Sequence, residues 1–105
     1  MENNNFELSA KTFIENLYDA IEAQDKDFDL DIEYSNEVLT IDVLGSIFVI
    51  NKQAPAKEIW LASPVSGPYH FSQEGGEWVD SKNNNLLTIL ANEISKILNK
   101  KIILK

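Results

Sequence analysis

The sequence contains no cysteine and a single histidine, His70, among its 105 residues. Without cysteine the chain has no disulfide bond, no thiolate metal site and no catalytic thiol. It also lacks the thiolates that usually hold an iron–sulfur cluster. One histidine argues against zinc or haem ligation and against most catalytic triads.

Long apolar runs and targeting signals are missing as well. No segment approaches the roughly 20 residues that cross a bilayer as a helix. Residues 1–5 have neither the basic nor the apolar region of a signal peptide, so we expect a cytosolic protein that does not bind membranes. The length predicts a single domain over residues 1–105. A hydrophobic fraction of 44% supports one modest core. A core of that size leaves little room for a deep substrate cavity and favours a protein that is not an enzyme.

Positive charge is scarce. The chain has 9 basic residues against 17 acidic ones, a formal net charge of −8. This balance disfavours nucleic acids and anionic membranes as partners and favours cations and basic protein surfaces. The last part of the chain is the more basic one. The acids crowd one stretch, where only Lys26 opposes them: Glu15, Asp19, Glu22, Asp25, Asp27, Asp29, Asp31, Glu33 and Glu37.

Apolar periodicity predicts two helices and six strands. Residues 5–24 carry an apolar stripe at helical spacing, as does a second stretch that follows possible N-cap residues at 83–85 and runs to Leu98. We expect strands at residues 28–34, 38–43, 47–51, 58–62, 69–71 and 77–79. A hairpin at Gly75–Gly76 joins the last two, and the apolar tail 102–104 packs back on the domain. This order predicts an α+β fold, a two-layer sandwich with both helices on one face of an antiparallel sheet.

The acidic residues are arranged on surfaces. Glu15, Asp19 and Glu22 are spaced four and three apart and share one helix face. In residues 28–34 apolar and acidic residues alternate, so the strand's acids point away from the core. Carboxylate oxygens suit hard cations, including iron. The same acids also fit two other roles: solubility with protection of an exposed sheet edge, and docking of a basic partner surface.

A tight calcium cage is a poor fit to this stretch. Asp27-x-Asp29-x-Asp31 resembles the start of an EF-hand loop. That loop continues with glycine and ends with a bidentate glutamate, whereas Ile32 and Val38 stand at these positions. We therefore reject EF-hand calcium binding.

Trp60 is expected on the sheet face opposite the helices, because Ile59 and Leu61 alternate with it. An exposed tryptophan is a common protein-binding anchor; the alternative is that neighbouring side chains cover it. His70 shares this outward face if its neighbours point inward, as a partner contact, a secondary metal ligand or a solvated histidine. Trp78 is assigned to core packing.

The stretch from Asn51 to Pro64 has asparagine and glutamine two apart, then a proline, then Trp60-Leu61 on the next strand. This pattern resembles the signature of the frataxin family, called CyaY in bacteria. Ser66-Gly67-Pro68, the His70-Phe71 pair and Trp78 continue the match, and the acidic first helix and strand extend it over nearly the whole chain. Ala20 and Ile21 depart from the pattern, since some relatives carry an adjacent acidic pair there.

The resemblance implies a function and its residues. Frataxins bind ferrous and ferric iron weakly on an acidic ridge. They dock on the cysteine desulfurase and scaffold protein that build iron–sulfur clusters, and they modulate that assembly. The chain is expected to be a monomer that holds no cluster itself, with an iron-dependent oligomer as the alternative. The implied metal ligands are Glu15, Asp19, Glu22, Asp25, Asp27, Asp29, Asp31 and Glu33. The implied partner contacts are Asn51, Gln53, Trp60 and His70, with exposure of Trp60.

Three other functions stay open at this point. Iron oxidation would make the protein an enzyme, although the helical Glu-x-x-His arrangement of di-iron proteins is missing. Self-assembly into an iron store is a second alternative. A third is an acidic adaptor that does not bind iron specifically.

Overall fold

The computed structural model describes residues 2–27 and 29–104. Within this part the chain forms two helices and one antiparallel sheet whose six strands follow each other in sequence order. The elements are α1 (Glu2–Gln24), β1 (Leu30–Ser35), β2 (Val38–Val43), β3 (Ser46–Gln53), β4 (Glu58–Ser63), β5 (Gly67–Glu74), β6 (Glu77–Val79) and α2 (Leu86–Leu98).

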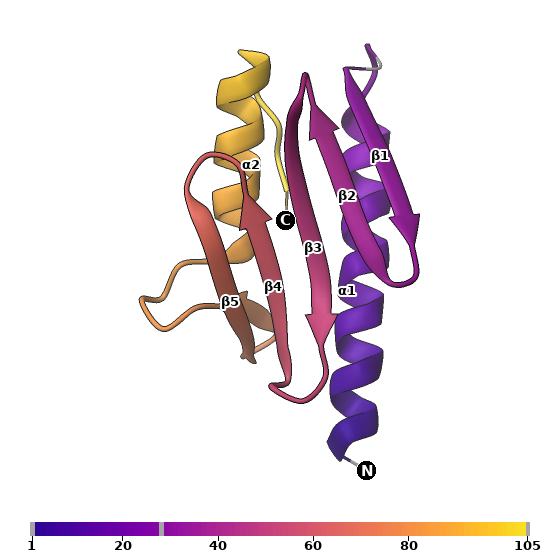
Figure 1. The fold of residues 1–105 in the computed structure, drawn as a ribbon, viewed down its shortest axis with the longest axis vertical. Coiled ribbons are helices and arrows are strands. Elements are labelled where there is room, and N and C mark those ends of the chain that lie inside the picture. Colours follow the sequence, from indigo (N-terminus) through magenta and orange to yellow (C-terminus); the bar gives the residue numbers. More distant parts are fainter. Residues whose placement is uncertain (1, 28, 105) are drawn as a thin grey trace.

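Both helices lie on the same side of the sheet, so the expected two-layer α+β sandwich is confirmed (Figure 1). Period-two alternation turns one set of strand side chains toward the helices, where they are buried, and leaves the other sheet face without a covering layer. The buried strand residues are Leu39, Ile41, Val43, Phe48, Ile50, Ile59, Leu61 and Phe71. The buried helix residues that meet them include Ala10, Ile14, Leu17, Ile21, Leu86, Leu90 and Ile94.

The element boundaries differ from the sequence-based ones at several points. Helix α1 begins at Glu2 rather than near residue 5, and β1 begins at Leu30 rather than at Phe28, which lies outside the described residues. Strand β5 also runs further, from Gly67 to Glu74, and includes Pro68. Its partner β6 pairs only with residues 72–74. Proline is tolerated in β5 because this half of the strand is a sheet edge, where a missing N–H removes no ladder bond.

Asparagine residues close both ends of α2. The side chain of Asn85 accepts hydrogen bonds from the backbone N–H groups of Leu87 and Thr88, as its expected N-cap role requires. At the other end Asn99 adopts a left-handed conformation, with φ of 55°. Lys100 then donates its N–H to the Ser95 carbonyl at 3.2 Å, which turns the chain back on itself.

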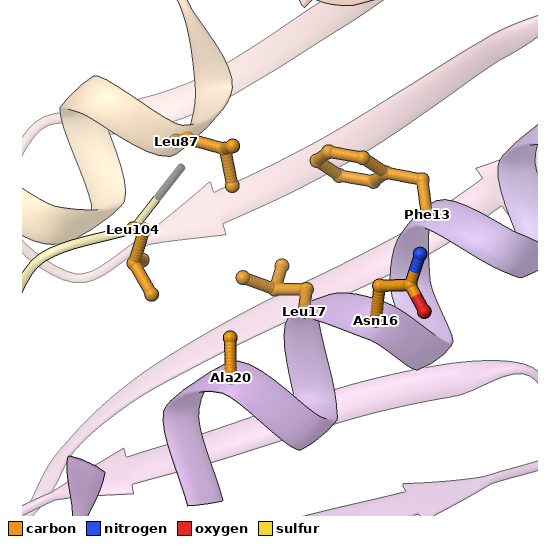
Figure 2. Close-up of a pocket in the computed structure, with 6 residues that line it drawn as sticks. All are labelled: Phe13, Asn16, Leu17, Ala20, Leu87 and Leu104. Atoms are coloured by element: carbon orange, nitrogen blue, oxygen red, sulfur yellow. The ribbon is translucent and has the colours of Figure 1, made fainter. Parts of the chain in front are cut away.

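The C-terminal tail folds back over the domain, as expected. Ile102 is 6% exposed, and its N–H donates to Ser95 Oγ at 2.9 Å. The Gln24 side chain binds the Ile103 backbone twice, accepting from its N–H at 2.9 Å and donating to its carbonyl at 2.5 Å. Leu104 then reaches the seam between the helices. There a small pocket of about 120 Å³ is lined by Phe13, Asn16, Leu17, Ala20, Leu87 and Leu104 (Figure 2).

Neither helix in the described residues combines the length and the apolar character that a bilayer crossing requires.

Candidate functional site: an acidic ridge and an open sheet face

The fold brings the predicted acids of α1 and β1 to one edge of the molecule. The two elements are in contact there, and the rings of Tyr18 and Tyr34 lie 6.2 Å apart between them. All of the acids are exposed except Asp25 and Asp29, which are half-buried. We call this set the acidic ridge: Glu15, Asp19 and Glu22 on α1, Asp25, Asp27 and Asp29 around the connection, and Asp31 and Glu33 on β1.

Nearby carboxylates raise the pKa of both tyrosines at the contact between α1 and β1. The charge of Glu22 is the main cause that raises the pKa of Tyr18, whose hydroxyl also donates to Glu22 Oε2 at 3.3 Å. Burial raises the pKa of Tyr34, and the charges of Glu15 and Glu37 raise it further. The acids of α1, together with Glu37 of the β1–β2 turn, therefore act on both tyrosines at the contact between α1 and β1.

Asp25 has a structural role that the sequence did not reveal. Its Oδ1 accepts the Asp29 N–H at 2.7 Å, and both carboxylate oxygens accept the Leu30 N–H at 3.2–3.3 Å. These bonds satisfy backbone donors where the chain passes from α1 into β1. Among the predicted metal ligands, Asp25 is thus the one whose oxygens are directed into the backbone.

Lys100 reaches the ridge from the C-terminal tail. Its Nζ lies 2.8 Å from Oδ2 of Asp27 and 2.8 Å from Oδ2 of Asp29. Hydrogen bonding to Lys100, and then its charge, lower the pKa of Asp27, and the two carboxylates raise the pKa of Lys100 above its ordinary range. Along the sequence only Lys26 opposes these acids. The fold adds Lys100, about 70 residues away, as the partner that actually binds them.

The carboxylates of the acidic ridge lie side by side and do not converge on one point. In residues 2–27 and 29–104, no three Asp, Glu or His side chains come close enough together to hold a metal ion. A strand alternates its side chains across two faces, so the β1 acids form a row. Such a surface offers one or two carboxylates to each cation, which suits weak binding of hard cations.

The open sheet face carries the second group of predicted residues. Cross-strand pairing puts Asn51 of β3 opposite Trp60 of β4, and Trp60 opposite His70 of β5. The three side chains therefore form one row across the face that no helix covers. Gln53 lies two residues beyond Asn51, on the same face, and pairs with Glu58.

Trp60 is half-buried on that face, although the sequence led us to expect an exposed ring. The His70 ring stacks on it, with centroids 4.0 Å apart and planes 8° from parallel. Trp60 Nε1 donates to Glu58 Oε1 at 2.8 Å, and the same oxygen lies 3.9 Å from His70 Nδ1. The outward direction is thus as expected, while two neighbours cover part of the ring.

Lys52, between Asn51 and Gln53, points to the helix side and was not singled out from the sequence. Its ammonium contacts Glu7 of α1, and it lies 2.6 Å from Glu37 in the β1–β2 turn. Hydrogen bonding to both acids raises the pKa of Lys52, whose side chain is 15% exposed. This contact fixes β3 against α1 and so steadies the strand that presents Asn51 and Gln53.

Comparisons with known proteins place this architecture among relatives. A family model described as "Frataxin-like domain" matches residues 1–100. The chain is 41% identical over 96 residues to "Frataxin homolog, mitochondrial" of Saccharomyces cerevisiae, covering 87% of this chain and 55% of that protein. It is 48% identical over 73 residues to the protein of the same name in Schizosaccharomyces pombe, covering 65% of this chain and 46% of that one. The chain thus spans about half the length of these curated relatives.

Solved structures agree with the fold. Trimeric frataxin from Saccharomyces cerevisiae, complexed with ferrous iron, superposes with a TM-score of 0.79 at 39% identity, covering 88% of this chain and 87% of that one. Frataxin from Psychromonas ingrahamii, of the CyaY family, superposes with a TM-score of 0.77 at 24% identity, covering 98% and 97% of the two chains. The second similarity shows the shared fold alone.

Proposed function

We propose that this chain, which belongs to the frataxin family, is an iron-binding accessory and regulatory protein of iron–sulfur cluster assembly. The observation that carries the proposal is the acidic ridge, a row of mostly exposed carboxylates shared by α1 and β1. Oxygen ligands of this kind suit ferrous and ferric iron. The similar trimeric frataxin of Saccharomyces cerevisiae is a complex with ferrous iron, which supports iron as the cation.

Iron is expected to bind the ridge weakly and to enter at its open part first. Asp25 is engaged by backbone donors, and Asp27 and Asp29 are paired with Lys100. The remaining acids are exposed, and together they form the part of the ridge that we propose takes up iron: Glu15, Asp19, Glu22, Asp31 and Glu33.

We propose that the open sheet face docks on the cysteine desulfurase and the scaffold protein. Asn51, Trp60 and His70 lie in one row there, with Gln53 beside them. An aromatic ring flanked by amide groups fits the usual composition of an interface centre, where tryptophan is enriched. The acidic ridge would add electrostatic attraction to a basic partner surface.

The role proposed is binding and regulation. Iron oxidation predicts saturable oxygen consumption with turnover, and an iron store predicts iron-dependent light scattering; either result would replace the proposed role. We propose a monomer as the working form, although the Saccharomyces cerevisiae structure is trimeric, and sedimentation with and without iron tests this.

A cytosolic location is likewise proposed. This location differs from that of the two yeast relatives, whose names describe them as mitochondrial. Fractionation of the source cells, followed by immunodetection of the protein, tests the location directly.

The first test is an anaerobic titration of ¹⁵N-labelled protein with ferrous iron, followed by amide NMR signals, with magnesium as the parallel cation. Selective broadening along the acidic ridge under iron, with little change under magnesium, is the expected result. A variant with Asp31→Asn and Glu33→Gln should lose the broadening on β1. The matched variant Glu74→Gln and Glu77→Gln removes two exposed acids of the β5–β6 hairpin and should keep it. Equal effects of iron and magnesium would leave the ridge as a docking surface only.

A further inference from the structure

We propose that Lys100 is a built-in competitor of iron, whose ammonium occupies the space between Asp27 and Asp29 that a cation would take. This regulation rests on the iron binding proposed above. It divides the acidic ridge into an open part, on α1 and β1, and a closed part that accepts iron only when Lys100 leaves.

The geometry of the contact makes the two cations mutually exclusive. Lys100 Nζ lies 2.8 Å from one oxygen of each aspartate, so it bridges two carboxylates that are two residues apart. A metal ion bridging the same oxygens would lie between them at roughly 2.0–2.6 Å from each. Both cations need the same lone pairs and the same volume, and their like charges would repel at that separation.

The backbone around Lys100 is held in place, which keeps its side chain near the ridge. The Lys100 N–H donates to Ser95 at the end of α2. Two residues later Ile102 is buried in the core. The backbone N–H and carbonyl of Ile103 are both hydrogen-bonded to the side chain of Gln24 in α1. With the backbone fixed, the ion pair forms without further loss of backbone entropy, and its cost is limited to side-chain ordering and desolvation.

The two ion pairs of Lys100 are nevertheless weak enough to be broken by a competing cation. The side chains of Asp27, Asp29 and Lys100 are 74%, 35% and 34% exposed, and ion pairs with this much exposure to water contribute little each. A divalent cation at sufficient concentration therefore displaces the ammonium. The open part of the ridge binds iron first, and the closed part binds it at a higher iron concentration. The two ion pairs of Lys100 with Asp27 and Asp29 therefore set the concentration at which this second step occurs.

The test compares wild type with Lys100→Gln and Lys101→Gln in the anaerobic ferrous titration. Lys101 is exposed, and none of the ion pairs among the described residues involves it. Both variants lose one positive charge, so only the direct contact distinguishes them. In Lys100→Gln, iron should broaden the amides of Asp27 and Asp29 at a concentration lower by about fivefold to tenfold, as expected on removal of two exposed ion pairs. Lys101→Gln should shift that concentration by less than about twofold.

Wild type supplies an independent readout should Lys100→Gln fail to fold. Its Asp27 and Asp29 amides should broaden later than those of Asp19 and Glu33. The Lys100 side-chain signals should change in the same later step. Simultaneous broadening of all four amides, or identical behaviour of the two lysine variants, would overturn the role of Lys100 while leaving the ridge intact. Absence of iron-specific broadening from the whole ridge in every protein would overturn the proposed function itself.

Discussion

The rings of Trp60 and His70 stack across strands β4 and β5 with centroids 4.0 Å apart and planes 8° from parallel. Glu58 holds the edge of the same ring through the indole N–H. The tryptophan ring is therefore held in one orientation on the open sheet face before any partner binds. A prearranged ring loses little conformational entropy on binding, which is the property expected of an interface anchor.

Replacing Trp60 by alanine should weaken docking while leaving the protein folded. The ring is half-buried on the sheet face outside the core, so its loss should cost about 1–2 kcal/mol of unfolding free energy. As an interface anchor it should contribute about 2 kcal/mol or more to binding the desulfurase–scaffold complex, a loss of roughly thirtyfold in affinity. Chemical denaturation and binding assays on the same protein measure the two effects.

The control is Trp78→Ala. Trp78 is 2% exposed and packs against Phe6 and Phe13, with ring centroids 6.1 and 5.9 Å away. Its removal should destabilise the fold by about 3–5 kcal/mol. If instead Trp60→Ala were the variant that unfolds, Trp60 would be a core residue and the docking face would need another anchor.

Two consecutive isoleucines of the tail should differ sharply in how much stability is lost when each is replaced by alanine. Ile102 is 6% exposed and Ile103 is 50% exposed. Ile102→Ala should lower the unfolding free energy by about 2–3 kcal/mol through lost burial and a residual cavity. Ile103→Ala keeps its backbone bonds to Gln24 and should change stability by no more than about 0.5 kcal/mol. Urea denaturation of the matched pair is the measurement, and equal losses would contradict the placement of the tail.

The open part of the acidic ridge should make stability depend on cations. Two carboxylates about 10 Å apart in water repel by only ~0.4 kcal/mol, but several such pairs act together on α1 and β1. Added salt screens this repulsion, and a divalent cation that binds only the folded ridge stabilises it by mass action. Melting temperature should therefore rise with sodium chloride, and at lower concentration with ferrous iron under anaerobic conditions. The variant Asp31→Asn with Glu33→Gln should melt higher at low salt and respond less. A melting temperature indifferent to both cations would mean that the ridge is not strained.

Much of this arrangement could be predicted from local patterns. Alternation on β1 to β4 and the apolar stripes of the helices fix which residues meet in the core, and these are the features that the sequence displays directly. The row Asn51, Trp60, His70 also follows from pattern once the strands pair in sequence order. The second half of β5 was missed, because residues 72–74 are exposed and lack an apolar alternation.

The long-range polar contacts could not be predicted. Lys100 meets Asp27 and Asp29 only because the tail turns back at Asn99 and crosses to the end of α1. Lys52 meets Glu7 and Glu37 because β3 pairs with β2 and packs against α1. A flexible ammonium has several acids within reach, and sequence spacing carries no information about which one it binds. The hydrogen bonds that Asp25 accepts from the backbone could not be predicted either. Nothing in the sequence distinguishes this aspartate from the other acids of the ridge.

The contact between Lys100 and Asp27 should appear in the acid titration of the protein. Lys100 lowers the folded-state pKa of Asp27 below its ordinary value of 3.8. A group with a lowered folded pKa adds stability that is fully present above the unfolded pKa and is lost as pH falls through the folded pKa. The stability difference between wild type and Lys100→Gln should thus be constant near neutral pH and shrink once the pH falls below about 3.8. Carboxyl ¹³C shifts of Asp27 measure the pKa itself, which should rise toward its ordinary value in Lys100→Gln. The matched variant Lys101→Gln should leave it near the wild-type value. An Asp27 carboxyl that titrates identically in all three proteins would show that the ammonium does not stay between the aspartates in solution.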